Sequence, residues 1–508
     1  MIIDKFNRFL LARLHMESLM SWLTPGHLKR ALKHLPKELD GTYTQAVQRI
    51  EVQDEGAREP ARRLITWITY AKRELTIREV QHALAVGSDP DMKDFDDEFL
   101  LDVDILTSIC AGLVIVDQTS KTIRLIHYTT QEYFLRTSMF PKERQGIAAT
   151  CISYLSFDAF NSGPCSTVEA IDDRIQRYPL YDYVTRNWGY HYSEAAEEGL
   201  GRKVLDLLLC EEKVASYGQL FLYDEYSTIS HRTLGSRIRA SHSLSDTDLM
   251  VAMHWGAYFG LSEEVKALIT RGHDVEPAGT HRRTPLSWAA ERGHDIVVGL
   301  LLRKNPNLEA RDKSVFERTP LLWAVESGHE KVVELLLEAG ADLQNRDTNW
   351  GLTPLAWAAA DGHTPIARLL ISKKANVNAT YKDWGMTALS WAALRGREEV
   401  VELLLQNGAD TEVMDHYQCT PLAFAIHKRY EGTVRLLLKH GAKMNYTYFR
   451  VRGRLDGEGP LDLRERRLPD PRAPHPKPYQ RESMGKYRSP PKVRYARQWY
   501  SLLALTPR

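Results

Sequence analysis

The chain has 508 residues, too many for a single hydrophobic core, so we expect two or three domains plus tails. Its 67 Lys and Arg residues nearly equal its 66 Asp and Glu residues, and the formal charge of +1 excludes a general attraction to nucleic acid or anionic lipid. The five cysteines show no Cys-x-x-Cys spacing, which favours reduced thiols and predicts a cytoplasmic location, with the nucleus as the alternative. No stretch without Asp, Glu, Lys or Arg is longer than 14 residues, so we expect no membrane-spanning segment and no membrane partner.

The first part of the chain is predicted to be helical with one β-hairpin. The opening MIIDKFNRFLLARLHMESLMSWL is apolar, but charged residues interrupt it at helical intervals, which predicts an amphipathic helix rather than a signal peptide. Between residues 61 and 137 the pattern predicts three helices, two strands joined by a polar turn at Gln118 to Lys121, and a further helix. This order is typical of a winged helix. Residues 60–137 carry 9 Lys and Arg against 12 Asp and Glu, so the segment repels DNA phosphates and we expect it to contact protein.

A motif recurs five times in the second half of the chain, at intervals of 35, 34, 34 and 33 residues. Its threonine can cap a helix, the proline that usually follows suits the first helical position, and its glycine suits a left-handed turn. A second helix with an apolar stripe follows each copy, and because neither helix can bury its apolar face alone, the pairs must stack. The copies are TPLSWAAERGH at Thr284, TPLLWAVESGH at Thr319, TPLAWAAADGH at Thr353, TALSWAALRGR at Thr387 and TPLAFAIHKRY at Thr420, with a weaker sixth unit at Val251.

These copies resemble the ankyrin repeat, whose pattern is T-P-L-H-x-A with a period of about 33 residues. The histidine of that pattern is replaced in all five copies, so we expect its hydrogen bonds to be missing. The replacements are Ser287, Leu322, Ala356, Ser390 and Ala423. The next position is always a large aromatic, which we interpret as core; the alternative is an exposed aromatic strip that binds a partner. These aromatics are Trp288, Trp323, Trp357, Trp391 and Phe424.

A second column of aromatic or imidazole side chains stands three residues before each threonine, where ankyrin repeats normally place a polar residue at the hairpin tip. Hairpin tips project from the helical stack, and aromatic side chains are enriched where interfaces concentrate their binding energy. We therefore predict a partner-binding column; the alternative is that each ring packs on the next tip and only stiffens the array. The predicted residues are His281, Phe316, Trp350, Trp384 and Tyr417. The histidines at the turns between helices, His294, His329 and His363, are expected to form hydrogen bonds rather than to bind a metal.

The front half resembles a second family. The stretch from LPKELDGTYTQAVQRI to IRLIHYTTQEYFLRT is similar to the winged-helix region of fungal NACHT proteins, which belong to the STAND class of nucleotide-switched ATPases. FLLARLHMESL resembles the last helices of a NACHT ATPase, and YPLYDYVTRNWGYH resembles the helical connector that follows. In that family the histidine that matches His127 reaches the nucleotide phosphate. No GxxxxGK[ST] loop occurs here, so we expect that the ATPase part is missing, that no cofactor is bound, and that His127 is structural unless another chain supplies the nucleotide site.

No enzyme class fits the sequence. The same winged-helix region is named after GPI inositol-deacylase, but a hydrolase of that type needs a serine on a GxSxG turn, and the chain has none. His329 and Glu330 begin a HExxH zinc pattern, but Val333 stands where the second histidine would be. We therefore predict no catalytic residues and no metal ligands.

The predicted fold class is mainly α: an ankyrin-repeat solenoid preceded by a winged-helix domain and a helical connector. The predicted domains are the final helices of a NACHT ATPase at 1–56, the winged helix at 57–140, the connector at 141–245, about six repeats at 246–450, and a Pro- and Arg-rich tail at 451–508 that we expect to be disordered.

The predicted function is a non-catalytic protein–protein interaction module, a truncated NACHT-type receptor or adaptor that binds other proteins through the hairpin tips and concave face of its repeats. One alternative is part of a nucleotide-switched STAND ATPase whose motor is missing or supplied in trans. Another is a nuclear regulator that binds nucleic acid through its tail, because residues 450–508 hold 15 Lys and Arg against 6 Asp and Glu.

Overall fold

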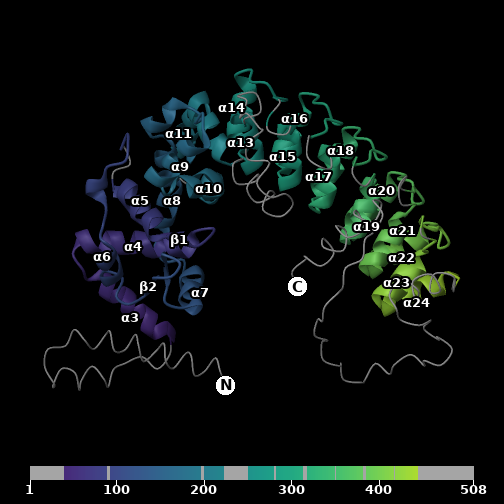
Figure 1. The fold of residues 1–508 in the computed structure, drawn as a ribbon, viewed down its shortest axis with the longest axis horizontal. Coiled ribbons are helices and arrows are strands. Elements are labelled where there is room, and N and C mark those ends of the chain that lie inside the picture. The colour runs from purple at the N-terminus through teal and green to yellow at the C-terminus, as the bar shows by residue number, and fades with distance from the viewer. Residues whose placement is uncertain are drawn as a thin grey trace, which may run out of the picture. The chain divides into compact units, whose positions relative to one another are not determined.

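The computed structural model describes residues 39–88, 92–195, 199–221, 250–277, 279, 282–312, 317–348, 351–380, 385–416 and 418–443. The predicted opening helix and the predicted tail at 451–508 lie outside these residues. The described chain is mostly helical, with a winged-helix domain followed in sequence by a connector and the ankyrin repeats, as predicted (Figure 1).

The winged-helix domain is built on the helix α4, whose first turn is capped by Asp54 through the backbone N–H of Ala57 at 3.0 Å. The side chains of Leu64, Ile65 and Trp67 on this helix are buried. The elements in chain order are α3 (Leu39–Glu51), α4 (Glu55–Tyr70), β1 (Leu75–Thr76), α5 (Ile77–Ser88), η1 (Asp97–Phe99), α6 (Val103–Ser108), β2 (Val114–Asp117), β3 (Thr122–Leu125) and α7 (Tyr128–Thr137).

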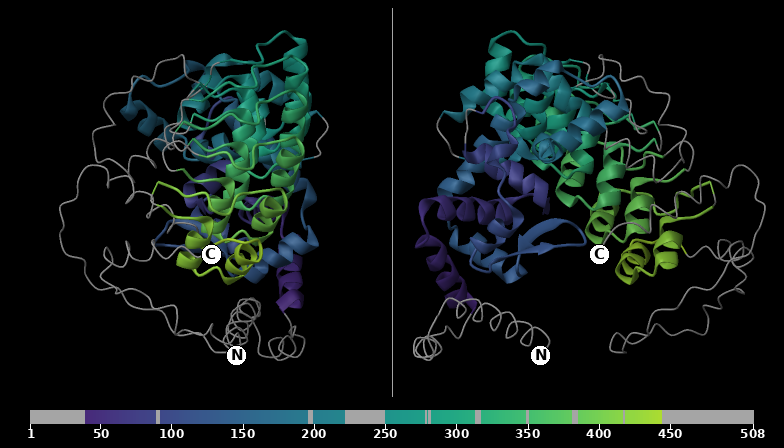
Figure 2. Two further views of the ribbon diagram at one scale, coloured as in Figure 1. Left: turned by 90° about the vertical axis from the view of Figure 1, so that its right-hand side faces the viewer. Right: turned by 60° about the vertical axis from the view of Figure 1, so that its left-hand side comes forward.

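The three strands form an antiparallel sheet in the order β1-β3-β2. β3 alternates as predicted, because Ile123 and Leu125 are buried while Arg124 between them is exposed. The predicted hairpin is confirmed, and the right-hand view of Figure 2 shows it clearly. The strand β1 was not predicted, because two residues are too few to show an alternating pattern. We expected the helix that begins at residue 61 to continue to residue 75, but Leu75 instead pairs with Ile123 as part of β1.

The connector is helical, as predicted. Its first helix packs against α4, α5 and α10, and its apolar residues are therefore spread around the helix instead of lying on one stripe. The elements are α8 (Pro141–Leu155), η2 (Asp158–Ser162), α9 (Val168–Arg177), α10 (Tyr181–Glu194) and α11 (Leu200–Leu208), and residues 211–221 are also helical.

Six helix pairs follow, and each packs on the next through both of its helices. The first helices of the pairs, which we call the inner helices, are α13 (Ala252–Phe259), α15 (Pro285–Arg292), α17 (Pro320–Glu326), α19 (Pro354–Asp361), α21 (Ala388–Arg395) and α23 (Pro421–Lys428). The second, outer helices are α14 (Ser262–Thr270), α16 (Asp295–Leu302), α18 (Glu330–Glu338), α20 (Thr364–Ser372), α22 (Glu398–Gln406) and α24 (Glu431–Lys439). Both series run side by side in Figures 1 and 2.

The repeated threonines cap the inner helices, as the motif predicts. In each of the five copies the hydroxyl oxygen accepts the backbone N–H three residues later, at 3.3 or 3.4 Å. The small residues that follow, such as Ala289 and Ala358, are fully buried where neighbouring inner helices approach each other. The recurring Thr and Ala positions are thus explained by capping and close packing.

The turn between the helices of a pair is held by the pair before it. The ring of His329 donates from Nε2 to the carbonyl oxygen of Glu291 at 2.9 Å, and His294 and His363 make the equivalent bonds one repeat earlier and later. The ring of His329 also lies against Gly293, where a Cβ atom would be 2.5 Å from Nδ1 and where φ is 75°. Glycine is therefore required at Gly293 by both conformation and space. The predicted hydrogen-bonding role of these histidines is confirmed.

Within the described ranges, no helix combines the length and the apolar composition needed to cross a membrane.

Three buried histidines make the fold sensitive to acid. Burial lowers the pKa of His82, His191 and His254 from 6.5 to about 4. Between these values the unfolded chain binds protons that the folded chain does not, so the stability present above pH 6.5 is lost as the pH falls towards 4.

We expect the melting temperature to fall from pH 7.5 to pH 5, because each histidine contributes up to about 1.4 kcal/mol per pH unit in that window. Differential scanning calorimetry at several pH values measures this, and a His82→Gln variant should lose part of the slope. A melting temperature that stays constant down to pH 5 would contradict the prediction.

Candidate partner-binding face of the repeats

The five side chains of the predicted partner-binding column lie outside the described residues, but the stems that carry most of their loops are described. In three hairpins an aspartate closes the loop by accepting backbone N–H groups from the far side. Asp312 accepts the N–H of Arg318 at 3.2 Å, Asp347 accepts that of Leu352 at 2.9 Å, and Asp415 accepts that of Cys419 at 2.7 Å. Each loop is therefore anchored at both ends.

Two arginines tie consecutive hairpins together. Arg311 donates from Nη1 to the carbonyl oxygen of Arg346 in the next hairpin at 2.7 Å, and Arg346 donates in turn to that of Thr380 at 2.8 Å. The structure shows that their guanidinium groups are engaged with backbone carbonyls, so the stems of three successive repeats are linked.

The aromatics of the inner helices are core residues at most positions. Trp288, Trp357 and Trp391 are 3%, 6% and 4% exposed, which agrees with the core interpretation and excludes an exposed strip at these positions. Trp323 and Phe424 are half-buried. The indole N–H of Trp323 donates to Asp312 Oδ2 at 2.8 Å and that of Trp357 to Asp347 Oδ2 at 3.0 Å. In both repeats the aspartate that closes the hairpin therefore also accepts a hydrogen bond from the tryptophan of the inner helix that follows.

Two buried arginines lie between these tryptophans, and the sequence analysis missed them. The guanidinium carbon of Arg283 lies 3.6 Å from the ring centre of Trp288 and 4.1 Å from that of Trp323. Arg318 lies 4.6 Å from Trp323 and 4.7 Å from Trp357. Such cation–π contacts contribute more when the cation is desolvated, as it is here. We call this alternating row of Arg283, Arg318 and the three tryptophans the Arg–Trp ladder.

Each ladder arginine pairs with a glutamate eight residues later. Arg283 forms an ion pair with Glu291, and Arg318 Nη1 lies 2.6 Å from Glu326 Oε2. In the next two repeats the arginine and the glutamate are both replaced by apolar residues. The two positions hold Leu352 and Ala360 in one repeat and Met386 and Leu394 in the other. This joint replacement is the sequence signal that could have revealed the pairs.

The glutamates on the inner helices are crowded. Burial, opposed by Arg318 and assisted by the negative charges of Asp361 and Glu291, raises the pKa of Glu326 to about 7. Burial also raises the pKa of Asp361. The inner face beside the ladder therefore holds carboxyl groups that retain protons more readily than ordinary surface acids do.

The family histidine, which the five clear copies replace, is present in the first unit. His254 occupies its position in the weak copy that begins at Val251, where Nδ1 accepts the N–H of Val251 and Nε2 donates to the carbonyl oxygen of Arg283, both at 3.1 Å. Because the second bond holds the backbone of a ladder residue, His254 helps to position the end of the Arg–Trp ladder.

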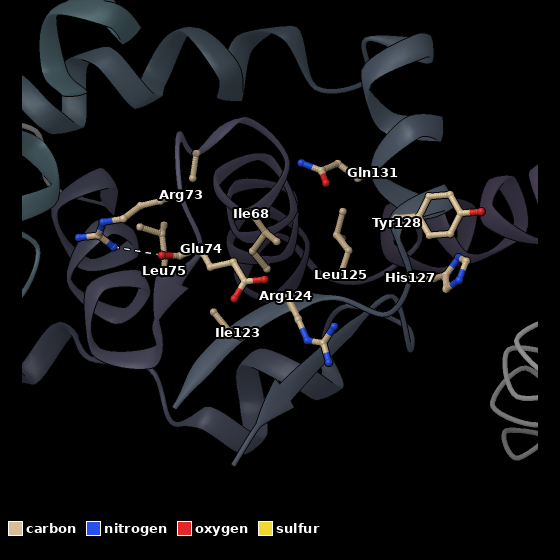
Figure 3. A pocket seen from close by; sticks show the side chains of 11 residues that line it. Ile68, Arg73, Glu74, Leu75, Ile123, Arg124, Leu125, His127, Tyr128 and Gln131 are labelled. Carbon is tan, nitrogen blue, oxygen red and sulfur yellow. Dashed lines mark hydrogen bonds between the residues drawn. The ribbon is translucent and has the colours of Figure 1, made fainter. Parts of the chain in front are cut away.

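His127 lies at the rim of a hollow of about 310 Å³ in the winged-helix domain, bordered also by Arg124, Tyr128 and Gln131 (Figure 3). Its Nδ1 accepts the N–H of Thr129 at 3.4 Å and lies 2.8 Å from the hydroxyl of the same residue, so the ring caps α7. This capping contact explains why a histidine stands between β3 and α7, and the explanation requires no bound nucleotide. The described residues bring no group of His, Cys, Asp or Glu side chains together that could hold a metal ion.

The Arg–Glu pairing predicts a non-additive response to mutation. Arg318→Leu should destabilise the repeats by about 2 kcal/mol, because Glu326 then lacks its partner in a half-buried site. Arg318→Leu combined with Glu326→Ala reproduces the pair found one repeat later and should be closer to wild type than the sum of the single changes. Urea unfolding of the four proteins measures this cycle; additive costs would contradict the coupling.

Comparisons with known proteins agree with both parts of the fold. Residues 249–347, 344–415 and 382–448 match the family described as ankyrin repeats (3 copies), and residues 49–140 match the family described as GPI inositol-deacylase, winged helix domain. An ankyrin repeat domain from Acinetobacter baumannii AYE is 28% identical, with 38% of this chain and 98% of that chain covered and a TM-score of 0.35. The human ASB11 ankyrin repeat domain is 26% identical, with 38% and 85% covered and a TM-score of 0.35. No curated protein matches the chain.

The chain thus contains ankyrin repeats preceded by a winged-helix domain of the GPI inositol-deacylase type.

Proposed function

We propose that this protein is a non-catalytic interaction module, a NACHT-type receptor or adaptor that binds other proteins through the hairpin tips and concave face of its repeats. The observation that supports this most is the linkage of successive hairpin stems by Arg311 and Arg346. The linked stems stand at fixed positions relative to one another. A partner that contacts several hairpins therefore has fewer stems to order, which reduces the entropic cost of association.

The residues proposed to make the contact are His281, Phe316, Trp350, Trp384 and Tyr417. The anchoring of three of their loops by Asp312, Asp347 and Asp415 supports this proposal, because a side chain on an anchored loop loses less freedom on binding. The tryptophans of the inner helices do not compete for this role, since three of them are buried in the core.

The winged helix is proposed to contact protein rather than DNA. In winged helices that bind DNA, the recognition helix enters the major groove, and α6 occupies the corresponding place in the order of elements. Here α6 and the segment before it expose the acidic side chains Asp96, Asp97, Glu98, Asp102 and Asp104. Their charge opposes the approach of a phosphate backbone and weakens the nucleic-acid alternative. We propose the cytoplasm as the location, with the nucleus as the alternative.

The hollow beside His127 is the feature of the described residues that could support the nucleotide-switch alternative. We expect no tight binding, because the chain has no GxxxxGK[ST] loop and the ring of His127 already caps α7. Isothermal titration of the purified chain with ATP and magnesium tests this. Tight magnesium-dependent binding, lost in His127→Ala, would overturn the non-catalytic proposal.

Partner binding is tested by changing two predicted tip residues. Trp350→Ala together with Trp384→Ala should reduce capture of a specific partner from a lysate by about tenfold or more, because aromatic anchors at interface centres dominate binding energy. Quantitative mass spectrometry of parallel pull-downs measures the loss.

The matched control is Ile296→Ala, which removes a side chain that is 65% exposed on the outer helix α16 and away from the hairpins. It should capture the same proteins as wild type. Unchanged capture by the Trp350 and Trp384 variant, with an unchanged melting temperature, would refute the proposed contact residues.

A further inference from the structure

The connector contains a helix whose sequence repeats that of an outer helix of the array. KVLDLLL at Lys203 in α11 matches KVVELLL at Lys331 in α18, position by position in residue type. Upstream, the dipeptide Trp188-Gly189 in α10 parallels Trp255-Gly256 in the first inner helix. Both segments precede residue 249, where the match to the ankyrin-repeat family begins. In the first outer helix the position of Lys203 and Lys331 is occupied by Glu263, which lies 60 residues after Lys203; this departs from the usual interval of 33 to 35 residues and hides the similarity from a search for a constant period.

The structure packs each of these two helices on one helix of the first repeat. α10 contacts the inner helix α13 and α11 contacts the outer helix α14, and both also pack on α8. Figure 1 shows α10 and α11 beside this first pair. Trp188 and Trp255 are both fully buried. α11 contributes Val204, Leu207 and Leu208 to the buried core.

The contact between α10 and α13 is close. The ring centre of Phe259 lies 5.0 Å from that of Trp188 and 5.1 Å from that of Tyr190. Gly189 faces the same ring, and a Cβ atom at this position would lie 2.1 Å from Phe259 Cγ. The hydroxyl of Tyr192 donates to Oε1 of the buried Glu264 in α14 at 2.6 Å. The pair α10–α11 thus covers the exposed end of both helices of the first repeat.

The first turn of α10 contacts the winged-helix domain. The hydroxyl of Tyr183 accepts the backbone N–H of Lys72 at 3.0 Å, and its ring centre lies 5.9 Å from that of Trp67 on α4. Arg73 forms an ion pair with Asp182 at 3.1 Å. One helix therefore contacts the winged helix through Tyr183 and the repeats through Trp188 and Gly189.

We propose that α10 and α11 cap the N-terminal end of the array, and that α10 also connects the first repeat to the core of the winged helix. A solenoid needs atypical terminal units, because an ordinary repeat at the end leaves an apolar face uncovered. Here the cap is the connector itself. Disturbing the cap therefore loosens the first repeats, which a merely adjacent linker would not do.

Gly189→Ala tests this proposal by whether it raises or lowers the melting temperature. Alanine is a better helix former than glycine, so at a position without neighbours the change stabilises a helix. At Gly189 the added methyl group collides with Phe259, so we expect the melting temperature to fall. Hydrogen exchange should become about tenfold faster in α13 and α14 as well as in α10. The matched control is Gly146→Ala in α8, where a Cβ atom meets nothing within 4 Å and the melting temperature should not fall.

A gentler variant keeps the test valid if Gly189→Ala fails to fold. Tyr192→Phe removes only the hydroxyl that bonds Glu264 and should speed exchange in α14. The proposal is overturned if Gly189→Ala is as stable as wild type, or if either variant changes exchange in α10 alone.

Discussion

Each helix of the array has one apolar face that only a neighbouring helix pair can cover, and the rest of the structure follows from this constraint. In α18, for example, Val332, Val333 and Leu336 are buried, while the charged residues Glu330, Lys331 and Glu338 are exposed. No pair is stable alone, so the pairs stack. The turn of each pair is hydrogen-bonded to the preceding pair through His294 or its equivalent. Both ends of the stack then require a cover. The capping role that we infer for α10 and α11 is one answer to that requirement.

The same constraint explains why buried charge is tolerated in the first half of the array. Arg283 and Arg318 enter the core only because aromatic faces of two successive repeats enclose them and glutamates of the same inner helices neutralise them. In later repeats Leu352 and Met386 fill the space with apolar atoms instead. Both solutions keep the inner helices packed, so the hairpins keep their spacing.

Much of the fold can be predicted from the sequence because threonine caps, glycine turns and apolar stripes are local signals that recur at a fixed period. The strand β1 was missed because two residues carry no pattern, and it exists only through its pairing with β3. The Arg–Trp ladder was missed because an arginine before a threonine looks like a surface residue until its two tryptophan neighbours are placed in space. Of the candidate site, the sequence predicts which side chains stand at the tips, while the stem contacts of Asp312 and Arg311 depend on the neighbouring repeat and required the structure.

The proposed binding of partners through successive hairpins requires a linear succession of paired helices, which is therefore the central claim. Hydrogen exchange resolved to single amides across residues 250–443 tests this claim most directly. We expect protected segments that recur every 33 to 35 residues, inner and outer helices alternating, with the central repeats most protected. Protection without that period, or protection confined to one end of the array, would contradict it.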